Sequence, residues 1–175
     1  MNNIDQIIND LTLEEKVSLL SGFNSWYTNK IERISIPSIK MSDGPNGVRG
    51  DSNSGKSSAC FPCAISIGSS WDLDQVKKIG VALGEEAQAK NVDVLLGPTI
   101  NIHRHPLGGR HFESFSEDPF LTGKIASNYV QGVQSQNVAA CLKHFVGNDT
   151  EFERHSISSN IDERTLREIY LLPFE

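Results

Sequence analysis

Residues 72–105 read DLDQVKKIGVALGEEAQAKNVDVLLGPTINIHRH, and this stretch decides the fold class. It opens on Asp72, which together with Gln75 has the pattern of a helical capping box. Four apolar residues then recur at helical spacing: Val76, Ile79, Leu83 and Ala87. The strand-like run 92–96 begins directly after the predicted helix ends at Asn91. A helix that leads straight into an apolar strand is typical of an α/β fold.

The same order of helix and strand recurs on both sides of this stretch. Thr12 and Glu15 form a second capping-box pattern, and Asp118 followed by Pro119 is a third helix start. These patterns predict helices over about 12–20, 118–137 and 162–173, and strands over 38–42 and 138–142. Because neighbouring parallel strands need crossover helices, the alternation predicts a parallel sheet.

The composition is that of an ordinary globular domain. The chain has 175 residues, of which 38% are hydrophobic and 22% are charged, so a disordered, collagen-like or coiled-coil chain is excluded. The formal net charge is −6, and the longest basic run is Lys77-Lys78. A nucleic-acid surface needs a basic face, so we expect no nucleic-acid partner.

Neither a membrane span nor a secretion signal is expected. No apolar stretch approaches the roughly 20 residues that a membrane span needs, and residues 1–5 lack a basic and then apolar leader pattern. We therefore expect a cytoplasmic protein with free thiols. Cys60 and Cys63 match a redox C-x-x-C pattern, but an apolar run, 64–68, follows them. Two buried structural thiols are the preferred interpretation.

The predicted elements form only part of a barrel. The sequence contains three or four strand patterns and ends just after a helix pattern. A barrel of eight strand–helix units takes about 250 residues, so we expect roughly the N-terminal half of a (β/α)8 TIM-like barrel. An open sheet edge would favour self-association of such a part. Residues 50–58, rich in Gly and Ser, are predicted to form a surface loop.

Charged side chains follow each predicted strand. In parallel α/β folds the carboxyl ends of the strands meet at one edge, where ligands bind. The residues predicted to meet there are Asp43, Arg49, Arg110, Lys143, His144 and Arg154. Such fixed donors and acceptors suit the hydroxyl groups of a sugar. The simpler alternatives are that Asp43 is a turn residue and that Arg110 is an exposed loop residue.

His103 and His105 suggest a second kind of site. Two imidazoles on one side of an extended segment can share a cation, as in metal-dependent hydrolases. A catalytic zinc site needs a third protein ligand, and Arg104 between the histidines adds positive charge. We therefore expect no metal and no cofactor, and keep a metal-dependent hydrolase that uses His103 and His105 as an alternative.

Seven motifs, taken in order, resemble glycoside hydrolase family 3, the β-glucosidase type. The resemblance covers nearly the whole chain, and the joint order of the motifs makes it specific. The motifs are LTLEEKV at 11–17, SDGPNGVR at 42–49, FP at 61–62, GPTINIHR at 97–104, GRHFESFSEDP at 109–119, KHF at 143–145 and DERTLRE at 162–168.

The resemblance implies an N-terminal (β/α)8-like barrel followed by an α/β sandwich domain. It also implies retaining hydrolysis of β-glycosides without a cofactor. In the family, residues that match Asp43, Arg110, Lys143 and His144 bind sugar hydroxyls in the −1 subsite. Residues that match Arg49 and Arg154 lie near that pocket, and the residue that matches His103 supports the substrate loop.

One departure from the family pattern concerns catalysis. The nucleophile of the family is an Asp in a Ser-Asp-Trp type motif, which does not occur in these 175 residues. The acid/base carboxylate comes later still, from the second domain. The expectation is thus the N-terminal portion of the barrel domain, residues 1–175, which binds a small β-glucoside or oligosaccharide. No catalytic residue is expected in it, and the C-terminal part of the same enzyme would complete it. The alternative from another class is a non-catalytic carbohydrate-binding module.

Overall fold

A three-stranded parallel sheet organises the chain. The computed structural model describes residues 4–50 and 57–175, so most of the predicted surface loop 50–58 lies outside the described residues. The strands are β1 (Met41–Asp43), β2 (Val94–Leu96) and β3 (Ala139–Ala140), in the order β1-β2-β3. Met41 pairs with Val94, which pairs with Ala139. The predicted parallel α/β arrangement is confirmed, although each strand is shorter than its apolar run.

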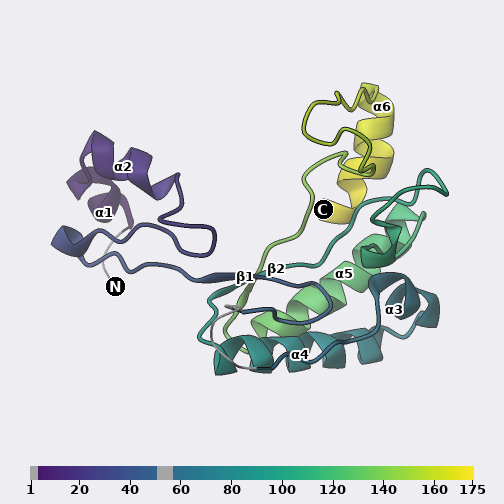
Figure 1. Ribbon diagram of the computed structural model, residues 1–175, viewed down its shortest axis with the longest axis horizontal. Coiled ribbons are helices and arrows are strands. Elements are labelled where there is room, and N and C mark those ends of the chain that lie inside the picture. Colours follow the sequence, from purple (N-terminus) through teal and green to yellow (C-terminus); the bar gives the residue numbers. More distant parts are fainter. Residues whose placement is uncertain (1–3, 51–56) are drawn as a thin grey trace.

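The crossover helices α4 (Leu73–Ala89) and α5 (Pro119–Gln134) lie side by side along the sheet (Figure 1). Asp72 caps α4 by accepting from the Gln75 N–H at 2.9 Å, and Asp118 caps α5. Shortly after the C-terminal end of each helix, an asparagine has a positive φ: 53° at Asn91 after α4 and 57° at Asn137 after α5. Asn tolerates this left-handed conformation, so each helix can end and a strand can follow at once.

The hydrophobic core lies between these two helices and the sheet. The helices approach closely where Gly80 faces Gly132, since a Cβ on Gly132 would lie 2.8 Å from Gly80 Cα. Tyr129 is buried in this core, and its hydroxyl donates to the Pro45 carbonyl at 2.9 Å. The most deeply buried core residues include Val76, Leu83, Leu95, Ile100, Ile125 and Val133.

The N-terminal helices are α1 (Ile4–Asp10) and α2 (Leu13–Leu19), which lie away from α4 and α5 in Figure 1. The predicted capping box of α2 is confirmed, because Thr12 and Glu15 exchange both hydrogen bonds. A short 3-10 helix, η1 (Glu32–Ile34), follows. Helix α1 was not predicted, although Ile4, Ile7 and Ile8 recur at helical spacing, and it buries no side chain.

The prediction of two buried thiols at Cys60 and Cys63 is wrong. The apolar run after Cys63 is a helix, α3 (Ala64–Ser70), and Cys63 is its N-cap residue. Cys60 is exposed and Cys63 is only partly buried, so they are not two buried thiols. Ile67 of this helix lies in the core, but Ile65 is 41% exposed. The apolar run therefore does not carry Cys60 and Cys63 into the core with it.

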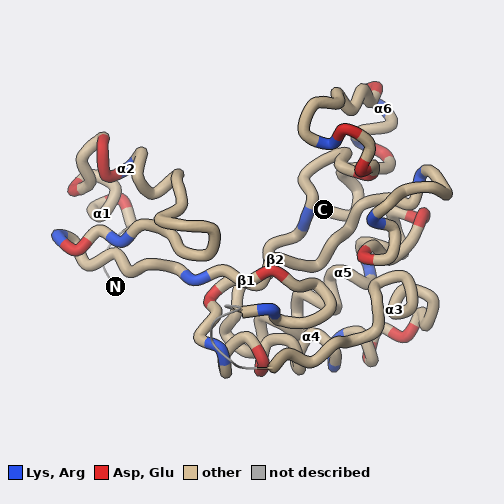
Figure 2. Tube along the Cα trace, viewed as in Figure 1, with Lys and Arg blue, Asp and Glu red and all other residues tan. Residues whose placement is uncertain are grey.

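The last predicted helix is a composite. It begins as expected at Asp162, whose carboxylate accepts from the Thr165 N–H at 3.0 Å. Helix α6 (Glu163–Thr165) passes into a π-helix, η3 (Leu166–Leu171), and then a 3-10 turn, η4 (Leu172–Phe174). No helix of the described residues is long and apolar enough to cross a membrane. Acidic and basic residues are interspersed along the trace (Figure 2).

Candidate sugar-binding site

The carboxyl ends of the three strands bring the predicted residues together. Asp43 is the last residue of β1, and Lys143 follows β3. Between them, Thr99 continues β2 and forms parallel bridges with both Lys143 and Ser114. Residues 110–114, which include the short 3-10 helix η2 (His111–Glu113), thereby lie against the same edge of the sheet.

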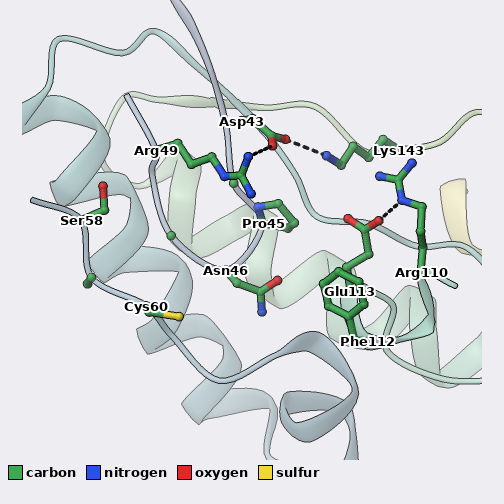
Figure 3. A pocket seen from close by; sticks show the side chains of 13 residues that line it. Asp43, Pro45, Asn46, Arg49, Ser58, Cys60, Arg110, Phe112, Glu113 and Lys143 are labelled. Atoms are coloured by element: carbon green, nitrogen blue, oxygen red, sulfur yellow. Dashed lines mark hydrogen bonds and ion pairs between the residues drawn. The ribbon is translucent and has the colours of Figure 1, made fainter. Parts of the chain in front are cut away.

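Asp43 is a partner of two cations. Its Oδ1 accepts from Lys143 Nζ at 3.0 Å, and its Oδ2 lies 3.6 Å from Arg49 Nη1 (Figure 3). The chain returns to Asp43 through a tight turn, in which Gly44 has a φ of 132° and a Cβ would lie 1.6 Å from the Gly47 carbonyl oxygen. Asp43 therefore begins a turn, but its side chain points to Lys143 and not into the turn.

Arg110 is held by three side chains. Its Nε donates to Glu113 Oε1, and its Nη2 lies 3.0 Å from His144 Nε2. Its Nη1 lies 3.6 Å from Glu151 Oε1. The Arg110 side chain is only 23% exposed. The simpler alternative, an exposed loop arginine, is wrong.

Glu113 is a site residue that the sequence analysis did not select. It is 5% exposed, yet it lines the pocket beside Arg110. A buried carboxylate needs partners, and here Arg110 supplies one while Thr99 Oγ1 donates to Glu113 Oε2 at 3.1 Å. The signal was present, because Glu113 follows Arg110 at a spacing of three residues in a Gly-rich loop.

The hydrogen bonds of His144 fit one tautomer of a neutral imidazole. Its backbone N–H donates to Asn101 Oδ1 at 3.1 Å, and its Nδ1 lies 2.8 Å from the same oxygen, so Nδ1 must carry the proton. The Arg110 guanidinium only donates, so Nε2 accepts. Burial, followed by the positive charges of Arg110 and Lys143, lowers the pKa of His144. Asn101 was not among the predicted residues.

Arg154 lies further out. Its Nη1 is 3.3 Å from Glu151 Oε2, and Glu151 in turn lies beside Arg110. The structure therefore brings Asp43, Arg49, Arg110 and Lys143 to the pocket itself. His144 and Arg154 are connected to it through Arg110 and its partners.

His103 and His105 face different partners. His103 Nε2 lies 3.0 Å from the Ser114 carbonyl oxygen, and its ring stacks on His111 with centroids 4.8 Å apart. His105 Nδ1 accepts from the Leu107 N–H at 3.1 Å. Among residues 4–50 and 57–175, no group of three or more His, Cys, Asp or Glu is arranged to hold a metal. His103 instead connects its segment to the one that carries Glu113.

The open pocket beside Asp43, Arg110 and Lys143 has a volume of about 410 Å³. This lies within the range of about 300–1,000 Å³ that is usual for small-molecule sites. Its charged lining offers two carboxylates, two guanidinium groups and an ammonium, and its remaining wall comes from two loop segments (Figure 3). The lining residues are Asp43, Gly44, Pro45, Asn46, Gly47, Arg49, Ser58, Ala59, Cys60, Arg110, Phe112, Glu113 and Lys143.

The family model described as the glycosyl hydrolase family 3 N terminal domain matches residues 1–175. A β-glucosidase from Rhizobium radiobacter is 57% identical over 174 residues, and thermostable β-glucosidase B from Acetivibrio thermocellus is 50% identical over 181 residues. The alignments cover 98% and 99% of this chain but only 21% and 24% of those relatives. The chain thus spans between a fifth and a quarter of their length.

Solved structures give the same result. The β-glucosidase from Kluyveromyces marxianus in complex with glucose superposes with a TM-score of 0.94 and 49% identity, over 98% of this chain and 21% of that one. β-Glucosidase 3B from Thermotoga neapolitana in complex with glucose has a TM-score of 0.88 and 41% identity, over 98% and 27%. Together with the parallel sheet, these likenesses confirm the predicted fold of a partial (β/α)8-type barrel.

Proposed function

Because this chain belongs to glycosyl hydrolase family 3, we propose that it forms the sugar-binding wall of a retaining β-glucosidase. The observation that carries the proposal is the ion pair of Asp43 with Lys143, in a pocket that also presents Arg110 and Glu113. Two solved relatives, whose structures contain glucose, support a glucoside as the substrate. The proposed reaction releases β-D-glucose from the non-reducing end of a β-glucoside.

The geometry suits a sugar ring for a chemical reason. Asp43 offers two carboxylate oxygens that accept from neighbouring hydroxyls, and Lys143 and Arg110 donate to the oxygens of others. Hydrogen bonds to charged groups are short and directional, so they favour one arrangement of hydroxyls over another. His144, connected to Arg110 at 3.0 Å, sets the direction in which that guanidinium points.

The proposal assigns binding, and not bond cleavage, to these residues. Retaining hydrolysis needs a nucleophile and an acid/base carboxylate about 5–5.5 Å apart. Asp43 and Glu113, the carboxylates of the pocket, are each already paired with a cation. We assign both catalytic carboxylates to parts of the enzyme other than residues 1–175, in agreement with the greater length of the relatives.

Substitutions in the whole enzyme test the assignment. Asp43→Ala should lower kcat/KM for an aryl β-glucoside by about 10–150-fold, since a charge-assisted hydrogen bond is worth roughly 1.5–3 kcal/mol. Lys143→Ala and His144→Ala should act in the same direction. Asp74→Ala and Lys78→Ala, at exposed positions of α4, are the matched controls. Wild-type kinetics in all three pocket variants would refute the assignment.

A second assay separates binding from chemistry. A polypeptide of residues 1–175 alone should release no product from an aryl β-glucoside, and activity should appear only when the rest of the enzyme is present. Cleavage by residues 1–175 alone, abolished in Asp43→Asn, would instead make Asp43 a catalytic carboxylate. A whole protein that binds glucose but cleaves no glucoside would be a carbohydrate-binding module.

A further inference from the structure

A largely buried ion pair lies at the C-terminal end of α4, against two segments that line the pocket. Lys90 is 6% exposed, and its Nζ lies 3.1 Å from Glu86 Oε1, one helical turn earlier. Lysine is almost never buried unless it is paired. Neither residue lines the pocket, so the proposed binding of the sugar does not account for the pair.

The Lys90 ammonium uses its three donors on three different segments. It donates to the Val48 carbonyl oxygen at 2.5 Å, to Ser58 Oγ and to Glu86 Oε1. An ammonium has three N–H donors, so all of them are satisfied. The Ser58 hydroxyl also donates to the Val48 carbonyl at 2.5 Å, which joins the two loop segments directly.

Glu86 completes the connection from the acceptor side. Its Oε2 accepts from the Val48 N–H at 3.2 Å, and its Oε1 accepts from the Ala59 N–H at 2.7 Å. Val48 is fully buried, and both its N–H and its C=O are thus satisfied by one pair of side chains on α4. A buried loop needs partners of both kinds for its backbone, and a carboxylate next to an ammonium supplies both.

The segments held in this way are the pocket wall. Gly47 and Arg49, which flank Val48, line the pocket, and so do Ser58 and Ala59. The two segments touch, since a Cβ on Gly47 would lie 2.2 Å from the Ala59 carbonyl oxygen. A shift of either segment therefore changes the shape of the pocket and the approach of Arg49 to its carboxylate partner.

We propose that Glu86 and Lys90 are positioning residues for the sugar pocket. They contact no sugar, and they act by fixing residues 47–49 and 58–59 against the end of α4. This inference rests on the proposed sugar-binding function of the pocket. Loss of the pair should loosen the pocket wall locally, whereas a purely structural role would lower the stability of the whole domain.

The test uses Lys90→Met and Glu86→Gln in the whole enzyme. Lys78→Met and Glu85→Gln, at exposed positions of the same helix, carry the same chemical changes and are the controls. Amide hydrogen exchange at Val48 and Ala59 should become about tenfold faster in the first two variants, the change expected when a hydrogen bond to a charged group is lost. Exchange within α5 should not change.

The kinetic measurement follows the same variants. Misplacing a binding group by about 1 Å costs up to about 100-fold, so kcat/KM for an aryl β-glucoside should fall by about 10- to 100-fold, mainly through KM. The controls should keep wild-type values. Unchanged exchange at Val48 and Ala59, or exchange that rises equally in α5, would overturn the inference.

A double variant covers the case in which a single variant does not fold. Removing one partner leaves a buried unpaired charge, whereas Lys90→Met with Glu86→Met removes both charges. The double variant should have a Tm near that of the wild type, while the amide hydrogens of Val48 and Ala59 exchange faster. Exchange at wild-type rates in it would refute the inference. Absence of glucosidase activity in the wild-type enzyme would count against the proposed function, and exchange would still decide the role of the pair.

Discussion

Two regions of the molecule are stabilised in different ways. The sheet region, residues 41–50 and 57–146, contains β1 to β3, α4 and α5 and most of the core. The N-terminal region, residues 4–36, contains α1 and α2 and lies apart from those helices (Figure 1). Among the described residues, the core cluster includes none from the N-terminal region. Its large exposed apolar residues are Ile4, Ile8, Leu13, Val17, Leu20 and Phe23.

Polar contacts and only two buried apolar residues, Leu11 and Ile31, hold the N-terminal region together. Arg33 donates to both carboxylate oxygens of Glu15, at 3.0 and 2.6 Å, and Asn29 Nδ2 donates to the Ser18 carbonyl at 2.9 Å. Exposed contacts of this kind contribute little to stability. Every residue that lines the pocket belongs to the sheet region. The site is therefore built in the part of the chain where a buried core fixes the positions of the side chains.

The largest expected difference is between two Leu→Ala substitutions. Leu83 in α4 is 0% exposed, and Leu13 in α2 is 72% exposed. Leu83→Ala should lower the free energy of unfolding by about 2–5 kcal/mol, through lost burial and a cavity. Leu13→Ala should change it by no more than about 0.5 kcal/mol. Denaturant unfolding of both variants measures the difference.

Equal losses of unfolding free energy in Leu83→Ala and Leu13→Ala would contradict the difference between the two regions. They would mean that another part of the whole enzyme covers Leu13, and that the N-terminal region gains its burial there. The chain spans between a fifth and a quarter of the length of the relatives, so the measurement is made on the whole protein. The same measurement on residues 1–175 then shows how both regions behave without the rest of the protein.

The sequence predicted the sheet region better than the N-terminal one. Burial determines which positions of its helices and strands are apolar. Val76, Ile79 and Leu83, which recur at helical spacing, are all buried in the structure. The charged residues that follow the strands were also found, because parallel strands end at one edge. Asp43, Arg110 and Lys143 therefore lie together as expected.

What was missed depends on contacts across the chain. Glu113 has a local partner in Arg110, but its second partner, Thr99, reaches it only through the fold. Asn101 holds His144, which is distant in sequence, and no local pattern records that contact. Cys60 was expected to be buried from its apolar neighbours, yet it faces the pocket. Helix α1 was missed although Ile4, Ile7 and Ile8 recur at helical spacing, because its 7 residues are fewer than such a pattern needs to be distinctive.

A smaller difference is expected between the two helix caps. The Asp118 carboxylate accepts from the Phe120 N–H at 2.8 Å and the Leu121 N–H at 3.1 Å, and Thr12 Oγ1 accepts from the Glu15 N–H at 3.2 Å. Asp118→Ala should lower the free energy of unfolding by about 1 kcal/mol. Thr12→Ala should mainly speed amide exchange within α2, because that helix opens without the core. Equal effects on global unfolding would contradict this.

The smallest expected effect is a pH dependence that differs between the regions. In the sheet region, burial is the main cause that lowers the pKa of both His111 and His144 from 6.5. The neighbouring charges are His103, His105 and Asp149 for His111, and Arg110, Lys143, Glu113 and Arg154 for His144. A histidine whose folded pKa is lowered binds its proton more readily when unfolded. The sheet region should therefore lose stability as the pH falls below 6.5.

The N-terminal region should respond in a lower pH range. The hydrogen bonds from Arg33 lower the pKa of Glu15 from 4.5 to about 2. A carboxyl group with a lowered folded pKa stabilises the fold fully above 4.5, and this stabilisation is lost as the pH falls toward about 2. Amide exchange measured from pH 7.5 to pH 3 should therefore accelerate in residues 110–144 before it does in residues 12–20, after correction for the intrinsic rate. Arg33→Met should remove the lower transition and leave the upper one, and His111→Asn should weaken the upper one. If both regions instead showed one transition at the same pH, they would unfold as one unit. Regions that unfold independently should each respond at the pH where their own groups titrate.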